Sequence, residues 1–261
     1  MTATCALQFA TELAQEAGQL ALRLRAEAPK DFVATKGAMD FITHADQAVE
    51  RLIRTRIAET YPKDAILGEE EGGEPAESFW IVDPIDGTTN YLKGLPDWGV
   101  CIARVRLGQI TEGVIALPDQ NRVATARRGE GAFLNGAPLR ALGNPSIALV
   151  QLGYSARIDL GEHLRHVEGV IARGADYRRS GAACVGLLAV AAGWSDAYYE
   201  RHLNLWDAAP GLLLIAEAGG TSTHAPLSEF ARKGSEVLAL GESLTSSADS
   251  WKTLFQRASA A

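Results

Sequence analysis

Several features that mark particular classes of protein are missing from this chain of 261 residues. Its three cysteines, Cys5, Cys101 and Cys184, are odd in number and far apart in the sequence, which predicts free thiols in a reducing compartment and argues against a disulfide framework. Neither the cysteines nor the five histidines have the spacing of a zinc site. Internal repeats and low-complexity segments are also absent, so the sequence does not predict a solenoid or a disordered tract.

Long hydrophobic runs and clusters of basic residues are missing as well. No apolar stretch approaches membrane-spanning length, and the first residues lack the basic and apolar regions of a signal peptide, so we expect a cytoplasmic protein that does not bind membranes. The formal net charge is -7, and nucleic-acid binding is not expected because it needs clustered lysine and arginine. An anionic small-molecule substrate would then need a local cation, which is a first indication of a metal ion.

What is present is the composition of an ordinary globular protein, with 47% hydrophobic and 22% charged residues. Helical spacing of apolar residues predicts helices over residues 4–26 and from Thr43 to about Tyr61, with a mobile loop over residues 35–40 between them. Asp46 would then lie near the start of the second helix, where its carboxylate could cap free backbone N–H groups.

Short extended segments follow these helices. Strands are predicted over residues 65–68, 79–83, 99–107, 110–117 and 122–127, and their short connections indicate an antiparallel sheet. The rest of the chain should hold strands over residues 147–152, 196–200 and 237–240 and helices over residues 162–172, 181–192, 206–218 and 244–257. This order is typical of an α+β or a layered α/β fold and not of a Rossmann array. We expect one domain with two halves, residues 1–143 and 144–261.

The most informative stretch is residues 83–90, which follow a buried strand and read Asp-Pro-Ile-Asp-Gly-Thr-Thr-Asn. A proline between Asp83 and Asp86 turns the chain, so both carboxylates can face one point and share a cation. The small polar residues after Asp86 leave backbone N–H groups available to an anion. The structural alternative is an Asp-Pro turn with Asp86 and Gly87 at its corner.

Two further acidic positions have both a functional and a structural interpretation. Glu69, Glu70 and Glu71 follow Gly68 and precede two more glycines, so the run is either part of a structured turn or a solvated acidic surface. Asp207 begins an almost wholly apolar helix and its carboxylate therefore needs a partner. It could be a metal ligand or the N-cap of that helix.

Together these segments resemble the three signatures of the inositol monophosphatase family of metal-dependent, lithium-sensitive phosphatases. The resemblance covers nearly the whole chain and is carried by Gly68-Glu69-Glu70, residues 80–91, Trp206-Asp207 and Glu217-Ala218-Gly219-Gly220. It implies a layered αβαβα sandwich of the inositol monophosphatase and fructose-1,6-bisphosphatase type, found as a homodimer. It also implies a phosphoric monoester hydrolase in which a water activated by Mg²⁺ attacks the phosphate in line.

The resemblance further assigns roles to individual positions. The ligands of two or three Mg²⁺ ions would be the side chains of Glu69, Asp83, Asp86 and Asp207 and the carbonyl of Ile85. The phosphate would be held by the N–H groups of Gly87 and Thr88. The attacking water would be oriented by Asp46 and Thr88, with Glu70 behind the metal ligands. Substrate hydroxyls would meet Glu200 beside Gly181, Ala182 and Ala183, and a loop carrying part of a further metal site would contain Lys36.

Inositol monophosphate is the expected substrate, and the segment 86–90 favours this branch of the superfamily. Alternatives are a 3'-phosphoadenosine nucleotide, fructose 1,6-bisphosphate or histidinol phosphate, or a non-enzymatic regulatory protein that keeps the fold. Three positions depart from the family's common residues: Ala182, His224 and Pro210, of which Pro210 is expected in the first turn of its helix. Ala182 and His224 leave the substrate open, because pocket-lining positions set specificity.

Overall fold

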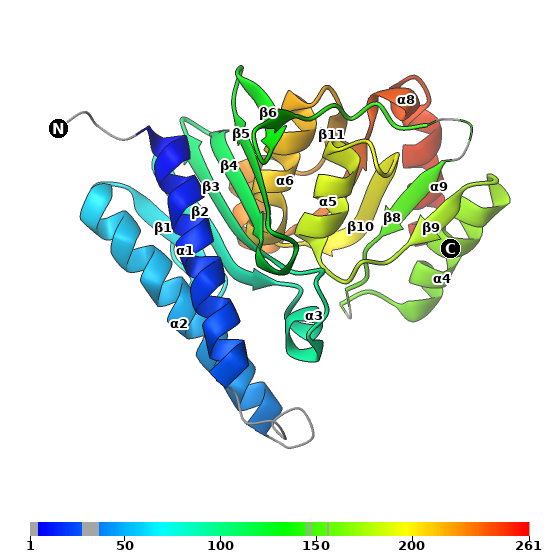
Figure 1. The fold of residues 1–261 in the computed structure, drawn as a ribbon. Helices are drawn as coiled ribbons and strands as arrows, with labels where there is room; N and C mark the ends of the chain where they lie inside the picture. Colours follow the sequence, from blue (N-terminus) through cyan, green and yellow to red (C-terminus); the bar gives the residue numbers. More distant parts are fainter. Residues whose placement is uncertain (1–4, 28–36, 145, 147, 156, 261) are drawn as a thin grey trace.

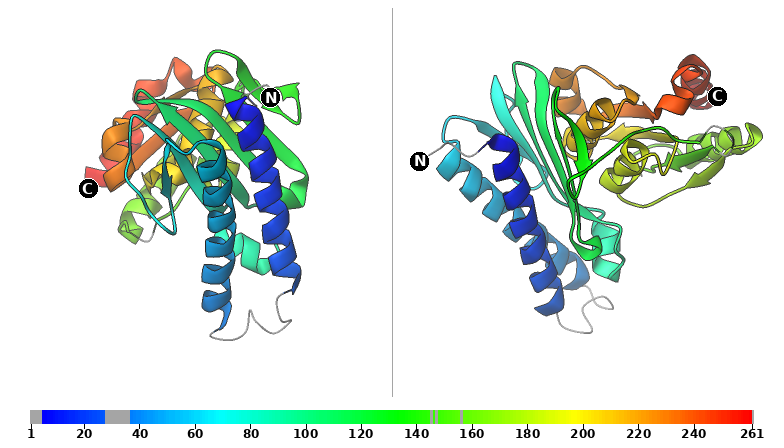
Figure 2. Two further views of the ribbon diagram at one scale, coloured as in Figure 1. Left: turned by 90° about the vertical axis from the view of Figure 1, so that its left-hand side faces the viewer. Right: turned by 45° about the horizontal axis from the view of Figure 1, so that its top comes forward.

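The fold has five layers that alternate between helices and sheets (Figures 1 and 2). The computed structural model describes residues 5–27, 37–144, 146, 148–155 and 157–260, with side chains described throughout these ranges except at residues 37–43 and 257–260. In order, the layers are α1 (Ala6–Glu27) with α2 (Gly37–Thr60), a seven-stranded sheet, α5 (Ala183–Ala191) with α6 (Leu205–Glu217), a five-stranded sheet, and α4 (Leu160–Ala172) with α9 (Ala248–Ala260). The predicted αβαβα sandwich is confirmed.

Helix α2 begins earlier than the sequence predicts. It starts at Gly37, so the expected loop is wrong from that residue onward, and Lys36 lies outside the described residues. The reason is local propensity: only Gly37 disfavours a helix strongly here, whereas Ala38 and Met39 are good helix formers. Asp46 therefore lies inside the helix and cannot cap its start.

The larger sheet contains β1 (Ala65–Gly68), β2 (Ser78–Asp86), β3 (Gly99–Arg106), β4 (Gln109–Leu117), β5 (Arg122–Arg127), β6 (Gly131–Leu134) and β7 (Ala137–Pro138), in that order. Strand β1 pairs parallel with β2, and the other neighbours are antiparallel. The predicted strands are confirmed here, but β2 runs on to Asp86. Helix α3 (Thr88–Lys93), where only a turn was expected, and the 3₁₀ helix η2 (Pro118–Gln120) follow β2 and β4.

The smaller sheet has the order β11 (Thr221–Thr223), β12 (Ser235–Leu240), β10 (Ala197–Leu203), β8 (Leu149–Leu152), β9 (Asp176–Arg178). Strands β9, β8 and β10 run parallel, so their carboxyl ends lie at the same edge of the sheet. The sequence reading missed β9, β11 and α7 (Leu227–Lys233), which are short. It also fused α8 (Glu242–Thr245) with α9. The division into halves near residue 143 falls between the two sheets and stays a prediction.

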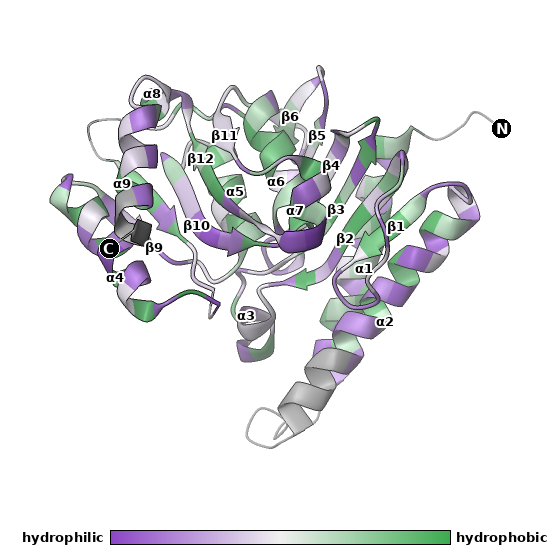
Figure 3. Cartoon of the chain, turned by 180° about the vertical axis from the view of Figure 1, so that it is seen from behind, coloured by the Kyte–Doolittle hydropathy of each residue, from purple (hydrophilic) through white to green (hydrophobic). Residues whose placement is uncertain are grey.

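The central helices are buried between the two sheets. Figure 3 shows hydrophobic colours along α5 and α6 and alternating colours along the outer helices. Helix α6 contains Pro210 beyond its first turn, contrary to expectation, because the helix begins at Leu205. It packs closely on β4, since a Cβ at Gly113 would lie 3.0 Å from the Cα of Pro210. Among the described helices, none has the length and apolar character required to cross a bilayer.

Candidate active site

The end of strand β2 brings two aspartates toward the same region. Asp83 pairs with Cys101 and Asp86 with Gly99, so three steps along β2 oppose two along β3, and the extra residue forms a bulge. Without the bulge, side chains three positions apart would point to opposite faces of the sheet. Asp83 is 1% exposed, and its carboxylate accepts a hydrogen bond of 3.0 Å from the N–H of Ile85.

The turn after Asp86 depends on close approach between two segments. Gly87 has a φ of 89°, and a Cβ at this position would lie 2.8 Å from the Cβ of Ala182. The Thr88 hydroxyl donates to the carbonyl oxygen of Ile85 at 3.2 Å. The N–H of Gly87 acts on the neighbouring carboxylate of Asp86 and opposes the increase in its pKa. Phosphate binding by Gly87 and Thr88 stays a prediction.

The acidic run after β1 is a structured turn built around a glutamate that the sequence reading missed. Glu50 on α2 is fully buried and accepts hydrogen bonds from the backbone N–H groups of Glu70 at 2.8 Å and Glu71 at 3.0 Å. Arg54 pairs with Glu50 at 2.7 Å. A Cβ at Gly68 would overlap the carboxylate of Glu50. A sequence signal for Glu50 existed, because it lies on the apolar face of α2 where a charge needs a partner.

Asp207 is held at the start of α6, but it is not the N-cap. Asn204 is the N-cap residue, and the Asp207 carboxylate accepts a hydrogen bond of 2.8 Å from the N–H of Asn204. The N-cap alternative is therefore wrong, because the helix begins two residues before Asp207. Burial raises the pKa of Asp207 well above its usual range, and repulsion from Asp86 and Glu69 adds to the increase.

The four predicted side-chain ligands form one acidic group. Burial is the largest cause of a raised pKa at Glu69, to about 7, and at Asp83 and Asp86 as well. Glu69 is exposed and lines a pocket. Interaction with the carboxyl group of Asp83 lowers the pKa of Glu69 and so opposes the effect of burial. No lysine, arginine or histidine within the described ranges lies within 4.0 Å of these carboxylates. Hard oxygen donors that lack a neutralising side chain fit a divalent cation such as Mg²⁺.

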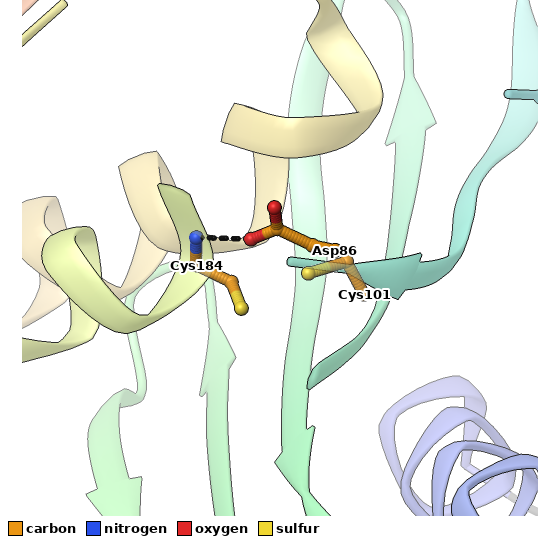
Figure 4. A group of neighbouring side chains, drawn as sticks. All are labelled: Asp86, Cys101 and Cys184. Atoms are coloured by element: carbon orange, nitrogen blue, oxygen red, sulfur yellow. Dashed lines mark hydrogen bonds between the residues drawn. The ribbon is translucent and has the colours of Figure 1, made fainter. Parts of the chain in front are cut away.

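Asp86 also lies beside two thiols that are distant in sequence (Figure 4). Its carboxylate accepts hydrogen bonds from the N–H groups of Cys184 at 2.6 Å and Ala183 at 3.3 Å, in the first turn of α5. Ligand atoms of Asp86, Cys101 and Cys184 all lie within 4.8 Å of one another. Cys101 and Cys184 are buried free thiols, whereas Cys5 is exposed. These contacts fix Asp86 against α5.

Asp46 lies behind the acidic turn. It is 4% exposed, and burial raises its pKa to about 8, with further increases from the negative charges of Glu70, Glu69 and Glu50. The structure therefore brings Asp46, Glu69 and Glu70 into one electrostatic group. The assignment of Asp46 and Thr88 to the attacking water, and of Glu70 to a supporting role, stays a prediction.

A pocket of about 250 Å³ connects the acidic group with the second sheet. Its lining includes predicted substrate and metal residues, namely Glu69, Asp86, Gly181, Ala182, Ala183, Glu200 and Asp207. Glu200 is 8% exposed, and its carboxylate accepts a hydrogen bond of 2.6 Å from the hydroxyl of Tyr198. Burial raises the pKa of Glu200 to about 7. A Cβ at Gly153 would overlap this carboxylate, so the glycine leaves room for it.

The same pocket has basic residues that the sequence reading did not find. Arg157 and Arg179 line it together with Tyr154. Arg179 directly follows β9, a strand too short and too exposed for the sequence pattern to reveal. No sequence signal distinguishes these arginines from the other basic residues, since their meeting depends on the order of strands in the sheet.

Comparison with known proteins shows which family and which relatives this chain resembles in sequence. The model of the inositol monophosphatase family matches residues 3–255. The chain is 39% identical over 244 residues to the "Nus factor SuhB" of Pseudomonas aeruginosa, which covers 87% of this chain and 89% of that protein. It is 41% identical over 203 residues to the "Inositol-1-monophosphatase" of Rhizobium meliloti, with 74% and 75% covered.

Solved structures match over almost the same span. The structure of Mycobacterium tuberculosis SuhB aligns with a TM-score of 0.80 at 34% identity and covers 97% of this chain and 96% of that chain. The structure of the Thermotoga maritima IMPase aligns with a TM-score of 0.81 at 26% identity, with 97% of each chain covered. The matches in sequence and in structure therefore both extend from the first helix to the last.

Proposed function

This chain belongs to the inositol monophosphatase family, and we propose from this premise that it hydrolyses a small phosphate monoester. The observation that carries the proposal is the group of carboxylates on β2, on the turn after β1 and on α6, which all have raised pKa values and lack a neutralising side chain within the described ranges. An acidic group of this kind is costly unless a cation neutralises it. Inositol monophosphate is the first candidate substrate.

The residues that would hold Mg²⁺ share hard oxygen atoms: Glu69, Asp83, Asp86, Asp207 and the carbonyl of Ile85. Bound Mg²⁺, two or three ions per site, would supply neutralisation of the phosphate charge and a lowered pKa for a water molecule. Lithium would be expected to inhibit by competition for this acidic group. Glu50 supports the site from behind, because its two hydrogen bonds fix the backbone of the turn that carries Glu69.

The chain's own residues would divide the remaining work between them. Gly87 and Thr88 would donate backbone N–H groups to the phosphate, and Asp46 and Thr88 would orient the attacking water, with Glu70 beside Asp46. The Thr88 hydroxyl already has a fixed direction, because it donates to the carbonyl of Ile85.

The alcohol part of the substrate would enter the wall of the pocket made by the second sheet. Glu200 would accept hydrogen bonds from its hydroxyl groups, and the small residues 181–183 would leave room for it. Lys36 would belong to a further metal site. Other phosphate monoesters of the superfamily fit the same acidic group, so the substrate is identified by measuring hydrolysis directly.

A panel of monoesters tests the proposal: inositol 1-phosphate, fructose 1,6-bisphosphate, 3'-phosphoadenosine 5'-phosphate and histidinol phosphate, each with millimolar Mg²⁺ and with EDTA. We expect phosphate release that requires Mg²⁺, with inositol 1-phosphate among the substrates hydrolysed. Absence of Mg²⁺-dependent release from every member of the panel would contradict the enzyme proposal. Release from the nucleotide alone would change only the substrate.

A second candidate function follows from the names of several relatives. The proteins of Pseudomonas aeruginosa, Xylella fastidiosa and Escherichia coli, which are 37–39% identical to this chain, are named "Nus factor SuhB". A Nus factor role would add a macromolecular partner that the sequence did not predict. Replacing the E. coli protein by this chain, and by its Asp83→Asn variant, tests it. Replacement by both forms supports a role independent of hydrolysis, whereas failure of both argues against the role.

The expected homodimer and its cytoplasmic location also belong to the proposal. Light scattering on the eluting protein measures the mass directly, and a mass twice that of the 27.8 kDa chain is expected. Elution as a monomer at micromolar concentration would contradict the dimer.

A further inference from the structure

The second wall of the pocket is formed at the carboxyl ends of three parallel strands. Strand β8 leads into Gly153 and Arg157, and β9 leads into Arg179. On β10, Glu200 directly follows the segment that pairs with β8. Because β9, β8 and β10 are adjacent and parallel, these residues meet at one edge of the sheet. In open sheets of this kind, ligands bind outside the carboxyl ends of the strands.

Arg157 and Arg179 are two cations without anionic partners at this edge. Within the part of the chain that the structure describes, neither guanidinium group forms an ion pair within 4.0 Å or a hydrogen bond. Arg201 on β10 differs from them, because it pairs with Glu162 at 3.0 Å and with Glu236 at 3.6 Å. Both arginines are exposed and line the pocket, so their guanidinium groups are available to a ligand that enters it.

Both arginines influence Glu200, which lines the same pocket. Their positive charges lower the pKa of Glu200 and so oppose the effect of its burial, which places them within electrostatic reach of that carboxylate. The guanidinium group of Arg179 lies 5.9 Å from the centre of the Tyr154 ring, which supports its side chain from the pocket wall. The pocket therefore has an acidic wall from the first sheet and α6, and a wall with two free cations from the second sheet.

Resting on the proposed hydrolysis of a phosphate monoester, we infer that the preferred substrate carries a second anionic group, a phosphate or a carboxylate, which Arg157 and Arg179 bind. The planar guanidinium group presents paired N–H donors that match either anion. The ester phosphate would face the acidic wall, and hydroxyl groups between the two anions would face Glu200. A neutral polyol monoester would leave both arginines unused.

Substrates that differ in the second group test this inference. The values of kcat/KM are measured at saturating Mg²⁺ with fructose 1,6-bisphosphate, which has a second phosphate, with 3-phosphoglycerate, which has a carboxylate, and with inositol 1-phosphate and glycerol 2-phosphate, which have neither. We expect the wild-type protein to favour at least one of the two anionic substrates over the neutral ones by about tenfold or more, and which one is favoured identifies the second anion.

Variants then assign that preference to the arginines. In the double variant Arg157→Gln/Arg179→Gln we expect the preference to fall about 10- to 100-fold through a higher KM, because each arginine contributes charge-assisted hydrogen bonds. Arg106→Gln removes an exposed arginine at the end of β3 and serves as the matched control, for which the preference should be unchanged. A double variant that loses activity equally on neutral and anionic substrates would overturn the inference.

The two proposals fail in different ways. Hydrolysis of neutral monoesters without a preference for a second anion would overturn the inference and leave the proposed function intact. If no monoester is hydrolysed, the proposed function fails. Thermal stabilisation by fructose 1,6-bisphosphate then still tests whether the arginines bind an anion. Equal stabilisation of the wild-type protein and the double variant would show that the arginines do not bind the anion.

Discussion

Two glycines, Gly68 and Gly153, leave room for neighbouring carboxylates and are not needed for a special backbone conformation. A Cβ at Gly68 would overlap the carboxylate of Glu50, and a Cβ at Gly153 would overlap that of Glu200. Neither glycine has a positive φ, so an alanine could adopt the same backbone angles. At Gly87, by contrast, the φ of 89° and the contact with Ala182 both require glycine. Substitution at Gly153 should therefore displace the Glu200 side chain, including its Cβ.

We expect Gly153→Ala to raise KM roughly tenfold, because the new methyl group displaces the Glu200 carboxylate from the hydroxyl-binding position. The melting temperature should also fall, since the new methyl group would lie 2.9 Å from the Cβ of Glu200 as well as against its carboxylate. Steady-state kinetics and thermal melts measure the two effects, with Glu200→Gln for comparison. An unchanged KM in Gly153→Ala, together with a raised KM in Glu200→Gln, would contradict this role for the glycine.

The cysteines give a simple test of side-chain burial. Cys5 is exposed, whereas Cys101 and Cys184 are buried beside Asp86. We expect one thiol per chain to react rapidly with a chromogenic disulfide reagent in the native protein and three to react in denaturant. In Cys5→Ser the rapid native reaction should disappear. Rapid labelling of a second native thiol would show that the contact between α5 and β3 opens.

Among the elements, α2 connects the hydrophobic core between the outer helices α1 and α2 and the larger sheet to the acidic turn. Its apolar side chains pack against the larger sheet, and Glu50 from the same face fixes the backbone of Glu70 and Glu71. Arg54, one turn later, pairs with Glu50 and donates to the carbonyl of Gly72. The turn that carries Glu69 thus depends on α2 as well as on its own glycines, of which Gly72 and Gly73 have positive φ.

We predict that Glu50→Gln lowers the free energy of unfolding by about 2–3 kcal/mol, because it removes the charge from hydrogen bonds in a buried site. It should also weaken Mg²⁺ binding, since a change in the backbone of the turn would move Glu69, which the turn carries. Glu71→Gln is the matched control: this side chain is 46% exposed and lies 3.6 Å from Arg54, so a loss below about 0.5 kcal/mol is expected. Urea unfolding compares the two, and equal losses would refute the role of Glu50.

Elements with strong periodic patterns were predictable from the sequence, and short or exposed ones were not. The strands from β1 to β5 and helices α1, α4 and α6 lie within a few residues of their predicted positions, because alternating or helical apolar patterns define them. Strands β9 and β11 have three residues each and mostly exposed or half-buried side chains, so no pattern marked them. Helix α3 follows a glycine and begins with two threonines, which indicated a turn.

At the scale of the whole molecule, the pocket exists because two sheets share a central helical layer. The bulge in β2 directs Asp86 toward α5, and α6 brings Asp207 beside it from the other half of the chain. These carboxylates could be assigned to one site from the sequence, because the resemblance to a family implied that they bind the same metal ions. Arg157 and Arg179 could not be predicted in the same way, because only the strand order of the smaller sheet brings them to the site. For Glu50 the apolar face of α2 was a signal that it needs a partner, but not of which partner.

The raised pKa values of Asp46 and Glu69 predict how the stability of the whole protein depends on pH. Asp46 and Glu69 have ordinary pKa values of 3.8 and 4.5, which the fold raises to about 8 and about 7. The folded protein therefore binds more protons than the unfolded chain, so this contribution to stability is complete below about pH 4 and is lost as pH rises through 7 to 8. Between pH 5.5 and 8.5 the protein in EDTA should become less stable.

Magnesium should reverse this trend, because it binds the deprotonated carboxylates. We expect the increase in melting temperature caused by 5 mM Mg²⁺ to be small at pH 5.5 and to reach roughly 5 °C or more at pH 8.5. Calorimetry or dye-based thermal melts across this range measure it. A shift that is independent of pH would mean that Mg²⁺ does not bind this acidic group.

The most direct test of the central claim is phosphate release from inositol 1-phosphate as a function of Mg²⁺ concentration in the wild-type protein, in Asp83→Asn and in Asp249→Asn. Asp83 is buried in the acidic group, whereas Asp249 is an exposed acid in the first turn of α9. We predict Mg²⁺-dependent release by the wild-type protein and Asp249→Asn, and a loss of at least about 100-fold in Asp83→Asn. Turnover that survives Asp83→Asn at every Mg²⁺ concentration would contradict the claim.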